Sequence, residues 1–248
     1  SYSYQFGLDA RYGITPNSVM KVTLNPDFGQ VEADPSVLNL TAFETFYDEK
    51  RPFFSEGSDF FSERLELFHS RRIGKKANYL EPEEGEPKSP LGNTTILGAM
   101  KVLGSTQSGF NYGFIEAITN EERVTWLYDS TKTSVLIEPL TYYSVAKIEA
   151  PMINKLSRLG IMATDVSRRE NPGATTVGLN WNLGLLDNRL FSNGQIAQSN
   201  KEGTIGNAWR FNIGYTDPSW WSARFWYGTY DDKFDINDIG YLRRNDLS

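Results

Sequence analysis

The chain has 248 residues and a formal net charge of −6, and it contains 13 Tyr, 15 Phe and 6 Trp but no cysteine. The acidic balance argues against a nucleic-acid-binding protein, which would show a basic stripe, and the absence of cysteine excludes disulfides and thiolate chemistry. No apolar stretch approaches the roughly 20 residues that a membrane-spanning helix needs.

Alternating apolar and polar residues predict about ten β-strands, with no intervening helices of the kind that build parallel sheets. The strands are expected at residues 2–12, 20–24, 94–104, 110–114, 140–150, 157–166, 174–185, 188–198, 206–216 and 219–230. Strands of soluble proteins average about 5–6 residues, whereas a tilted strand that crosses a bilayer needs about 9–11, which is closer to most of these runs. The sequence therefore predicts an all-β protein, an antiparallel transmembrane β-barrel.

The chemistry of the two strand faces supports the same interpretation. The polar face carries mainly Gly, Ser, Thr and Asn, with Arg210, Asn212 and Gly214 as one example, and not the Lys and Glu of a soluble sheet. Small polar residues suit the wet lumen of a barrel, and the other face would then contact lipid. The residues expected to face lipid are Trp181, Trp209, Phe211, Ile213, Tyr215, Trp221, Phe225 and Tyr227. The alternative is a soluble β-sandwich with an aromatic inner face.

The predicted connections alternate in length. Short ones are expected at 13–17, 104–107, 151–155, 186–187 and 217–218, and longer ones at 25–93, 119–139, 167–173 and 199–205. Short turns at one end and long loops at the other are typical of bacterial outer-membrane barrels. Both chain ends would then lie outside the cell, which predicts at least one further strand before Ser1 and one after Ser248. The chain would be part of a larger barrel.

Residues 25–93 interrupt the strand pattern as one long insert. Asp34 and Pro35 are suited to begin a short helix, as N-cap and first helical residue. The stretch LEPEEGEPKSP at 80–90 is rich in Pro and Glu, which is typical of a mobile loop tip. The aromatic residues of the first half favour packing instead. We therefore expect the insert to be a plug or gate in the barrel mouth, or an extracellular loop over it.

Four stretches carry a resemblance to a known family. They are TPNSVMKVTLNPDFGQVEADPSVLNLTAFETFYDEKRPFFSEG, FHSRRIG, TTILGAMKVLGSTQSGFNYGFIEAIT and DINDIGYLRRND. Together they resemble Gram-negative outer-membrane proteins in which a carbohydrate-binding module like family 9 precedes a barrel domain of unknown function. The module itself is absent from residues 1–248. The resemblance covers most of the chain and implies a place in the bacterial cell outer membrane, a link to polysaccharide and no established reaction.

The insert also holds the candidate site residues. They are the carboxylates Asp27, Glu32, Asp34 and Glu44 and the cations Arg51, Arg71 and Arg72. Two carboxylates about 5–10 Å apart would suit glycoside hydrolysis, and oxygen ligands from Asp27, Glu32 and Asp34 would suit Ca²⁺. The spacing matches no EF-hand loop, and a charged loop supplies acid pairs by chance. We therefore expect these acids to pair with arginines and hold the insert, with no catalytic residue or metal ligand assigned.

His69 is the only histidine, and no motif supports a catalytic triad or a zinc site around it. The sequence thus predicts an outer-membrane protein with a transport or surface-binding role in handling glycans or other polymers. Its expected partners are outer-membrane lipid, polysaccharide and other outer-membrane or periplasmic proteins, and it needs no cofactor. Two hypotheses stay open beside it: a barrel-borne glycoside hydrolase, and a structural or assembly subunit of an outer-membrane complex.

Overall fold

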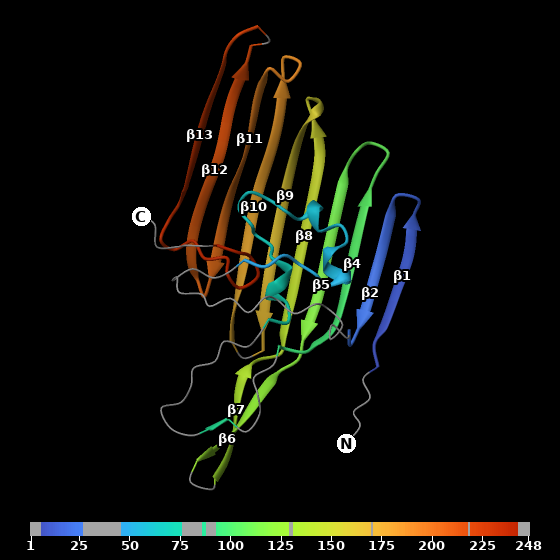
Figure 1. Ribbon diagram of the computed structural model, residues 1–248, viewed down its shortest axis with the longest axis vertical. Helices are drawn as coiled ribbons and strands as arrows, with labels where there is room; N and C mark the ends of the chain where they lie inside the picture. Colours follow the sequence, from blue (N-terminus) through green and yellow to red (C-terminus); the bar gives the residue numbers. More distant parts are fainter. Residues whose placement is uncertain are drawn as a thin grey trace.

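A computed structural model describes residues 6–26, 46–75, 86–87, 93–128, 131–169, 171–217 and 219–242. Its main element is one antiparallel sheet of ten strands, in the order β1-β2-β4-β5-β8-β9-β10-β11-β12-β13 (Figure 1). A small sheet of β3, β6 and β7 extends beyond one end of it. The all-β prediction is confirmed.

The ten strands of the large sheet correspond one to one with the ten predicted strands. They are β1 (Leu8–Thr15), β2 (Ser18–Leu24), β4 (Ile96–Ser105), β5 (Asn111–Thr119), β8 (Thr141–Met152), β9 (Asn154–Arg168), β10 (Asn171–Leu185), β11 (Leu190–Lys201), β12 (Thr204–Thr216) and β13 (Ser222–Tyr230). The small sheet, β3 (Glu86–Pro87), β6 (Glu122–Tyr128) and β7 (Thr131–Glu138), has no counterpart in the sequence prediction, which places loops there.

Two connections are shorter than predicted. Only residues 169–170 separate β9 from β10, and only Glu202 and Gly203 separate β11 from β12. Glu202 and Gly203 have φ angles of 54° and 82°, the pair of positive values that a type I′ hairpin turn requires. The predicted alternation of short and long connections is therefore wrong at these two places. Backbone pairing continues through polar residues that the hydrophobic pattern assigns to loops.

The large sheet is open among the described residues. Its edges are β1 and β13, which do not pair with each other, so the predicted barrel closure is not seen. β1 is exposed along its whole length, and β13 along all but its last residue. Each edge thus presents unpaired backbone groups that another strand could bind.

One face of the sheet is covered by two stretches of irregular chain. The first, residues 46–75, contains the short helical turns α1 (Pro52–Ser55), η1 (Ser58–Phe60) and η2 (Ser70–Arg72) and is called the docked segment here (Figure 1). The second, residues 231–242, is the C-terminal segment. We call this face of the sheet the covered face and the opposite one the open face. No helix in the described part of the chain is long and apolar enough to cross a bilayer.

The hydrophobic core lies between the covered face and the two segments. Large side chains come from the segments, including Phe53, Phe54, Phe61, Leu67 and Phe234. The sheet contributes small residues, Ala99, Ala117, Ala197 and Ala208, and larger ones such as Ile115, Val145, Met162 and Val166. The small side chains leave room for the rings, so the segments and the covered face fit together as one packed layer.

Gly206 marks the closest approach of the C-terminal segment to the sheet. A Cβ atom built on Gly206 would collide with the backbone of Lys233 and Phe234, which cannot move aside as a flexible side chain can. We predict that Gly206→Ala lowers the free energy of unfolding by about 1–3 kcal/mol, the usual cost of overpacking. Urea unfolding in detergent measures it.

Gly13→Ala is the matched control, because Gly13 also lies in a strand and its Cβ would meet nothing within 4 Å. Its effect should stay within about 0.5 kcal/mol. Equal unfolding midpoints for the two variants would contradict the close packing of the C-terminal segment on β12.

Candidate functional site

Of the predicted site residues, Asp27, Glu32, Asp34 and Glu44 lie outside the described residues, so the proposed acid pairs and the Ca²⁺ site built on them stay predictions. Arg51, Arg71 and Arg72 are described, and all three lie in the docked segment. Among the described residues, no three His, Asp or Glu side chains are grouped to hold a metal ion.

Arg51 joins the two halves of the docked segment. Its guanidinium donates hydrogen bonds to both Glu49 carboxylate oxygens at 2.6 and 2.8 Å, and to the backbone oxygens of Ser70 and Ile73 at 2.7 Å. Ser70 Oγ donates to the same carboxylate. Burial alone would raise the pKa of Glu49, but the hydrogen bonds and charge of Arg51 outweigh burial and hold the pKa below its usual value. Arg51 is thus bound to Glu49 in a buried ion pair within the docked segment.

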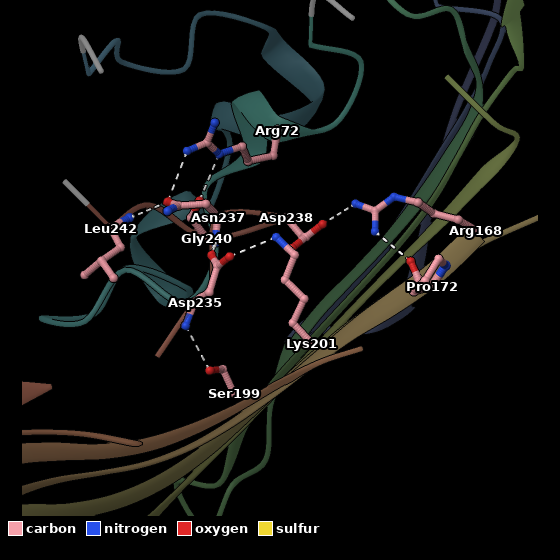
Figure 2. Close-up of polar contacts among 10 residues, drawn as sticks. All are labelled: Arg72, Arg168, Pro172, Ser199, Lys201, Asp235, Asn237, Asp238, Gly240 and Leu242. Atoms are coloured by element: carbon pink, nitrogen blue, oxygen red, sulfur yellow. Dashed lines mark hydrogen bonds and ion pairs between the residues drawn. The ribbon is translucent and has the colours of Figure 1, made fainter. Parts of the chain in front are cut away.

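Arg72 ties the docked segment to the C-terminal segment. Its Nε donates to the Gly240 backbone oxygen at 3.0 Å, and Nη2 donates to Asn237 Oδ1 at 3.3 Å (Figure 2). Between the same two segments, the Tyr241 backbone N–H donates to the backbone oxygen of Glu66 at 2.8 Å. Arg71 lies with its guanidinium 5.7 Å from the centre of the Tyr47 ring, a cation–π contact.

The C-terminal segment is in turn fixed to the sheet by charge. Lys201 on β11 lies 2.8 Å from an Asp235 oxygen and 2.9 Å from Asp238 Oδ2, while Arg168 on β9 binds Asp238 Oδ1 (Figure 2). Burial acts to raise the pKa of Asp238, but Lys201 and Arg168 outweigh it and hold the pKa below its usual value. Asp238 is therefore a buried anion with two cations, which is an anchor for the segment.

Three lysines of the covered face receive the docked segment. Lys21 on β2 pairs with Glu56. Lys101 on β4 donates to the backbone oxygens of Phe53 and Glu56, at the carboxyl end of α1 where a cation is favoured. Lys147 on β8 lies 3.0 Å from Glu63 Oε1. Each of these three lysines thus meets an acceptor of the docked segment.

Lys147 is the centre of the most buried of these contacts. Its side chain is 3% exposed, and it lies between Glu63 at 3.0 Å and Glu149 at 3.2 Å. Gln195 on β11 donates to the other Glu63 oxygen and accepts a 2.7 Å hydrogen bond from the Leu65 backbone N–H. Burial raises the pKa of Glu63, and the charge of Lys147 opposes that rise only in part. One ammonium shared by two carboxylates ties the segment to the sheet.

Glu63, Lys147, Glu149 and Gln195 are not among the site residues that the sequence predicts. The strand pattern points to three of them. Lys147 and Glu149 lie at every second position of β8, in phase with the buried Tyr143 and Val145, and Gln195 lies on the covered face of β11. A charged side chain on the covered side of a strand needs a partner. That partner, Glu63, lies far away in the sequence and shows no pattern of its own.

His69 packs against two aromatic rings. Its ring lies 4.8 Å from the centre of the Phe46 ring and 5.5 Å from that of Tyr241. Its backbone N–H donates to the Ile239 oxygen at 2.8 Å, so the residue links the two segments.

The residues expected to face lipid share the open face. Cross-strand register places Trp181 and Phe211 on either side of Gly194, and pairs Phe211 with Tyr227, Ile213 with Phe225 and Ile196 with Trp209. The Trp221 ring lies 5.1 Å from that of Tyr215 at the adjoining turn. Trp209 is 52% exposed, and no segment covers it. Their common face is as the sequence predicts; contact with lipid remains a prediction.

A hollow of about 580 Å³ opens where the docked segment stops short of the turn ends of β1, β2, β4 and β5. Its lining is mixed and includes Arg11, Asn17, Phe60, Leu103 and Tyr112. Arg11 lies at its rim, 3.6 Å from Glu56 of the segment. The segment therefore covers the face without filling it at this end.

The Glu49 anchor makes stability depend on acid. Because its folded pKa is lowered from 4.5, it contributes stability above pH 4.5 that is lost as the pH falls through the folded pKa. We predict that Glu49→Gln lowers the free energy of unfolding by about 1–3 kcal/mol at pH 7 and flattens its acid dependence. Urea unfolding from pH 7 to pH 3 measures both. Glu121→Gln is the control: Glu121 forms an exposed pair with Arg123, so its substitution should change neither the free energy of unfolding nor its acid dependence. If wild type and Glu49→Gln showed the same dependence of stability on pH, Glu49 would not be an anchor.

The Lys147 contact should behave as a coupled buried pair. Lys147→Met leaves Glu63 buried without its ammonium, which should cost about 3–5 kcal/mol, and adding Glu63→Gln should restore a large part of it. Urea unfolding gives the coupling free energy, and proteolysis at residues 62–64 reports release of the segment. Lys155→Met, on an exposed part of β9, should be neutral. Additive effects of the two substitutions would show that the pair does not hold the segment.

Comparison with known proteins adds the family. No curated protein and no solved structure matches the chain. A family model described as a domain of unknown function, DUF5916, matches residues 1–248, which is the whole chain. The long-stranded sheet with its covered polar face is therefore the structure of this domain, and the chain belongs to the DUF5916 family.

Proposed function

We propose that this domain forms part of the wall of an outer-membrane β-barrel, with its open face towards lipid and its covered face towards the lumen. In this proposal the docked segment is a gate or plug, and the barrel transports or binds glycans or other polymers. The distribution of side chains between the two faces carries the proposal.

The open face is apolar over a wide area. One row of paired residues runs from β1 to β10 through Tyr12, Met20, Val102, Phe114, Ala146, Ala163 and Val177. A second runs from β8 to β12 through Ile148, Ile161, Leu179, Ile196 and Trp209. Soluble proteins seldom expose connected apolar patches above a few hundred Å², because each Å² left in water costs about 25 cal/mol. A bilayer removes that cost.

The apolar area has a polar border. Glu116, Ser144, Asp165, Thr175 and Asn200 form a cross-strand row on the open face, towards the end that carries β6 and β7. Ser144 donates to Glu116 and Thr175 donates to Asp165, each at 2.8 Å. Such a row suits the boundary between the hydrocarbon layer and the head groups.

The covered face supports the lumen assignment. Its lysines and Gln195 would be costly against lipid, whereas they bind the docked segment here. Edge strands β1 and β13 would also be costly in a bilayer, since their outer backbone groups lack partners. The proposal therefore requires further strands that pair with both edges and close the barrel.

No described contact favours the hydrolase hypothesis. The described carboxylates of the docked segment for which contacts are defined, Glu49, Glu56 and Glu63, are each bound to a cation. The exposed edges are compatible with an assembly subunit as well, but they do not explain the apolar open face.

The two faces can be told apart by their tryptophans. Trp209 lies on the open face of β12, and Trp226 lies on the covered side of β13, paired with Asn212. We predict that, in vesicles whose acyl chains carry bromine, a chain with Trp209 as its only tryptophan is strongly quenched. A chain with only Trp226 should be quenched little, because its ring faces the lumen.

The two single-tryptophan chains control for each other, since the residues lie on neighbouring strands. Equal quenching of both would overturn the assignment of faces. Recovery of the chain in the aqueous fraction after vesicle flotation would overturn membrane insertion itself.

A further inference from the structure

The covered face extends beyond the docked segment, and there it carries a row of polar residues. Register places Arg158, Asn182, Asn193, Asn212 and Trp226 side by side across β9, β10, β11, β12 and β13. Three carboxamides in line, between a guanidinium and an indole, form a strip across the strands. We call it the asparagine row.

The row is accessible at its surface and incompletely bonded beneath it. Trp226 is 77% exposed, so no segment covers its ring. Asn212 is 8% exposed, and its Nδ2 donates to Asn193 Oδ1 at 2.8 Å. Asn212 Oδ1 has no hydrogen-bond partner among the described residues. A buried acceptor without a donor is uncommon in folded proteins, and it indicates a place where a donor from outside could bind.

Cations surround the row although the chain as a whole is acidic. Arg158 is part of it. Arg210 lies two residues before Asn212 on β12, and Arg224 lies two residues before Trp226 on β13. Arg224 is exposed, with its guanidinium over the Phe191 ring at 5.2 Å. Glu149 lies 3.4 Å from Arg158 and 3.2 Å from Lys147, so one carboxylate is shared by two cations. The local charge therefore favours an anionic ligand.

We propose that the asparagine row is a binding site for an acidic oligosaccharide. Carboxamides donate and accept at once, as neighbouring hydroxyl groups require. Guanidinium groups bind carboxylates through paired hydrogen bonds. The exposed indole of Trp226 offers a flat apolar face on which a sugar ring can stack. This proposal rests on the proposed function, because it takes the covered face to be the lumen.

The docked segment borders this site. Leu65 of the segment donates to Gln195, and the Arg64 backbone oxygen accepts from Arg210 at 3.4 Å. Gln195 and Arg210 form the cross-strand pair next to Asn193 and Asn212 of the asparagine row. A polymer bound along the row would therefore lie beside the Glu63 anchor of the docked segment, the proposed gate.

Titration calorimetry of the full chain in detergent tests the site, with hexagalacturonate as the probe. We expect saturable binding that Trp226→Ala weakens about tenfold or more, which is about 1.4 kcal/mol. Trp220→Ala is the matched control, because Trp220 is 84% exposed at the neighbouring turn and lies outside the row. No binding, or equal loss from both substitutions, would overturn the site.

Two further probes separate charge from sugar recognition. Methyl-esterified hexagalacturonate, which lacks the charges, should bind more weakly, and Arg224→Gln should remove that difference in part. The affinity for hexaglutamate should not depend on Trp226. If hexaglutamate bound as tightly as hexagalacturonate, the site would not be specific for a saccharide. If the methyl ester bound as tightly as hexagalacturonate, the site would not be specific for an acidic ligand. Bromine quenching of the chain with Trp209 as its only tryptophan, in vesicles, shows whether a failure belongs to this site or to the membrane proposal.

Discussion

Lys147 has a charge on the covered face of β8 and almost no contact with solvent, and a charge in that position must be neutralised where it lies. Its partner Glu63 comes from the docked segment, and Gln195 binds both the Glu63 carboxylate and the Leu65 backbone. Lys21 and Lys101 impose the same requirement further along the sheet. These ammonium groups bind acceptors of the segment at fixed places on the sheet, and an aromatic core packs between the segment and the sheet.

The covered face combines two properties that rarely occur together. It carries lysines and other polar side chains, yet it packs a core, to which the segments contribute Phe side chains and the sheet contributes alanines together with Ile115, Val145, Met162 and Val166. A soluble antiparallel sheet places its apolar face inward and its polar face in water. Here an apolar face is also left uncovered among the described residues, and this is the physical basis for proposing that it contacts lipid.

The two segments depend on each other. Arg51 closes the docked segment on Glu49, Arg72 joins it to Gly240, and Asp238 fixes the C-terminal segment to Lys201 and Arg168. A change at one anchor therefore affects both segments. If the docked segment is a gate, this chain of contacts defines what must break for it to leave the face, and the asparagine row lies directly beside it.

The sequence by itself determined the ten long strands and which residues share each face, because alternation is a local property that one strand displays alone. It also predicted ion pairs between the arginines and the acids of the insert, among them Asp27, Glu32, Asp34 and Glu44, which lie outside the described residues. Only the tertiary structure decided that Glu63 meets Lys147, that Asp238 meets Arg168, and that asparagines of β10, β11 and β12 fall into one row. These contacts join residues far apart in the chain, and they depend on register and on the path of an irregular segment. The tight turn at Glu202 and Gly203 is not predicted, because backbone pairing there continues through polar residues that show no hydrophobic pattern. The hairpin of β6 and β7 was within reach of the sequence, since Val124, Trp126 and Tyr128 recur at every second position.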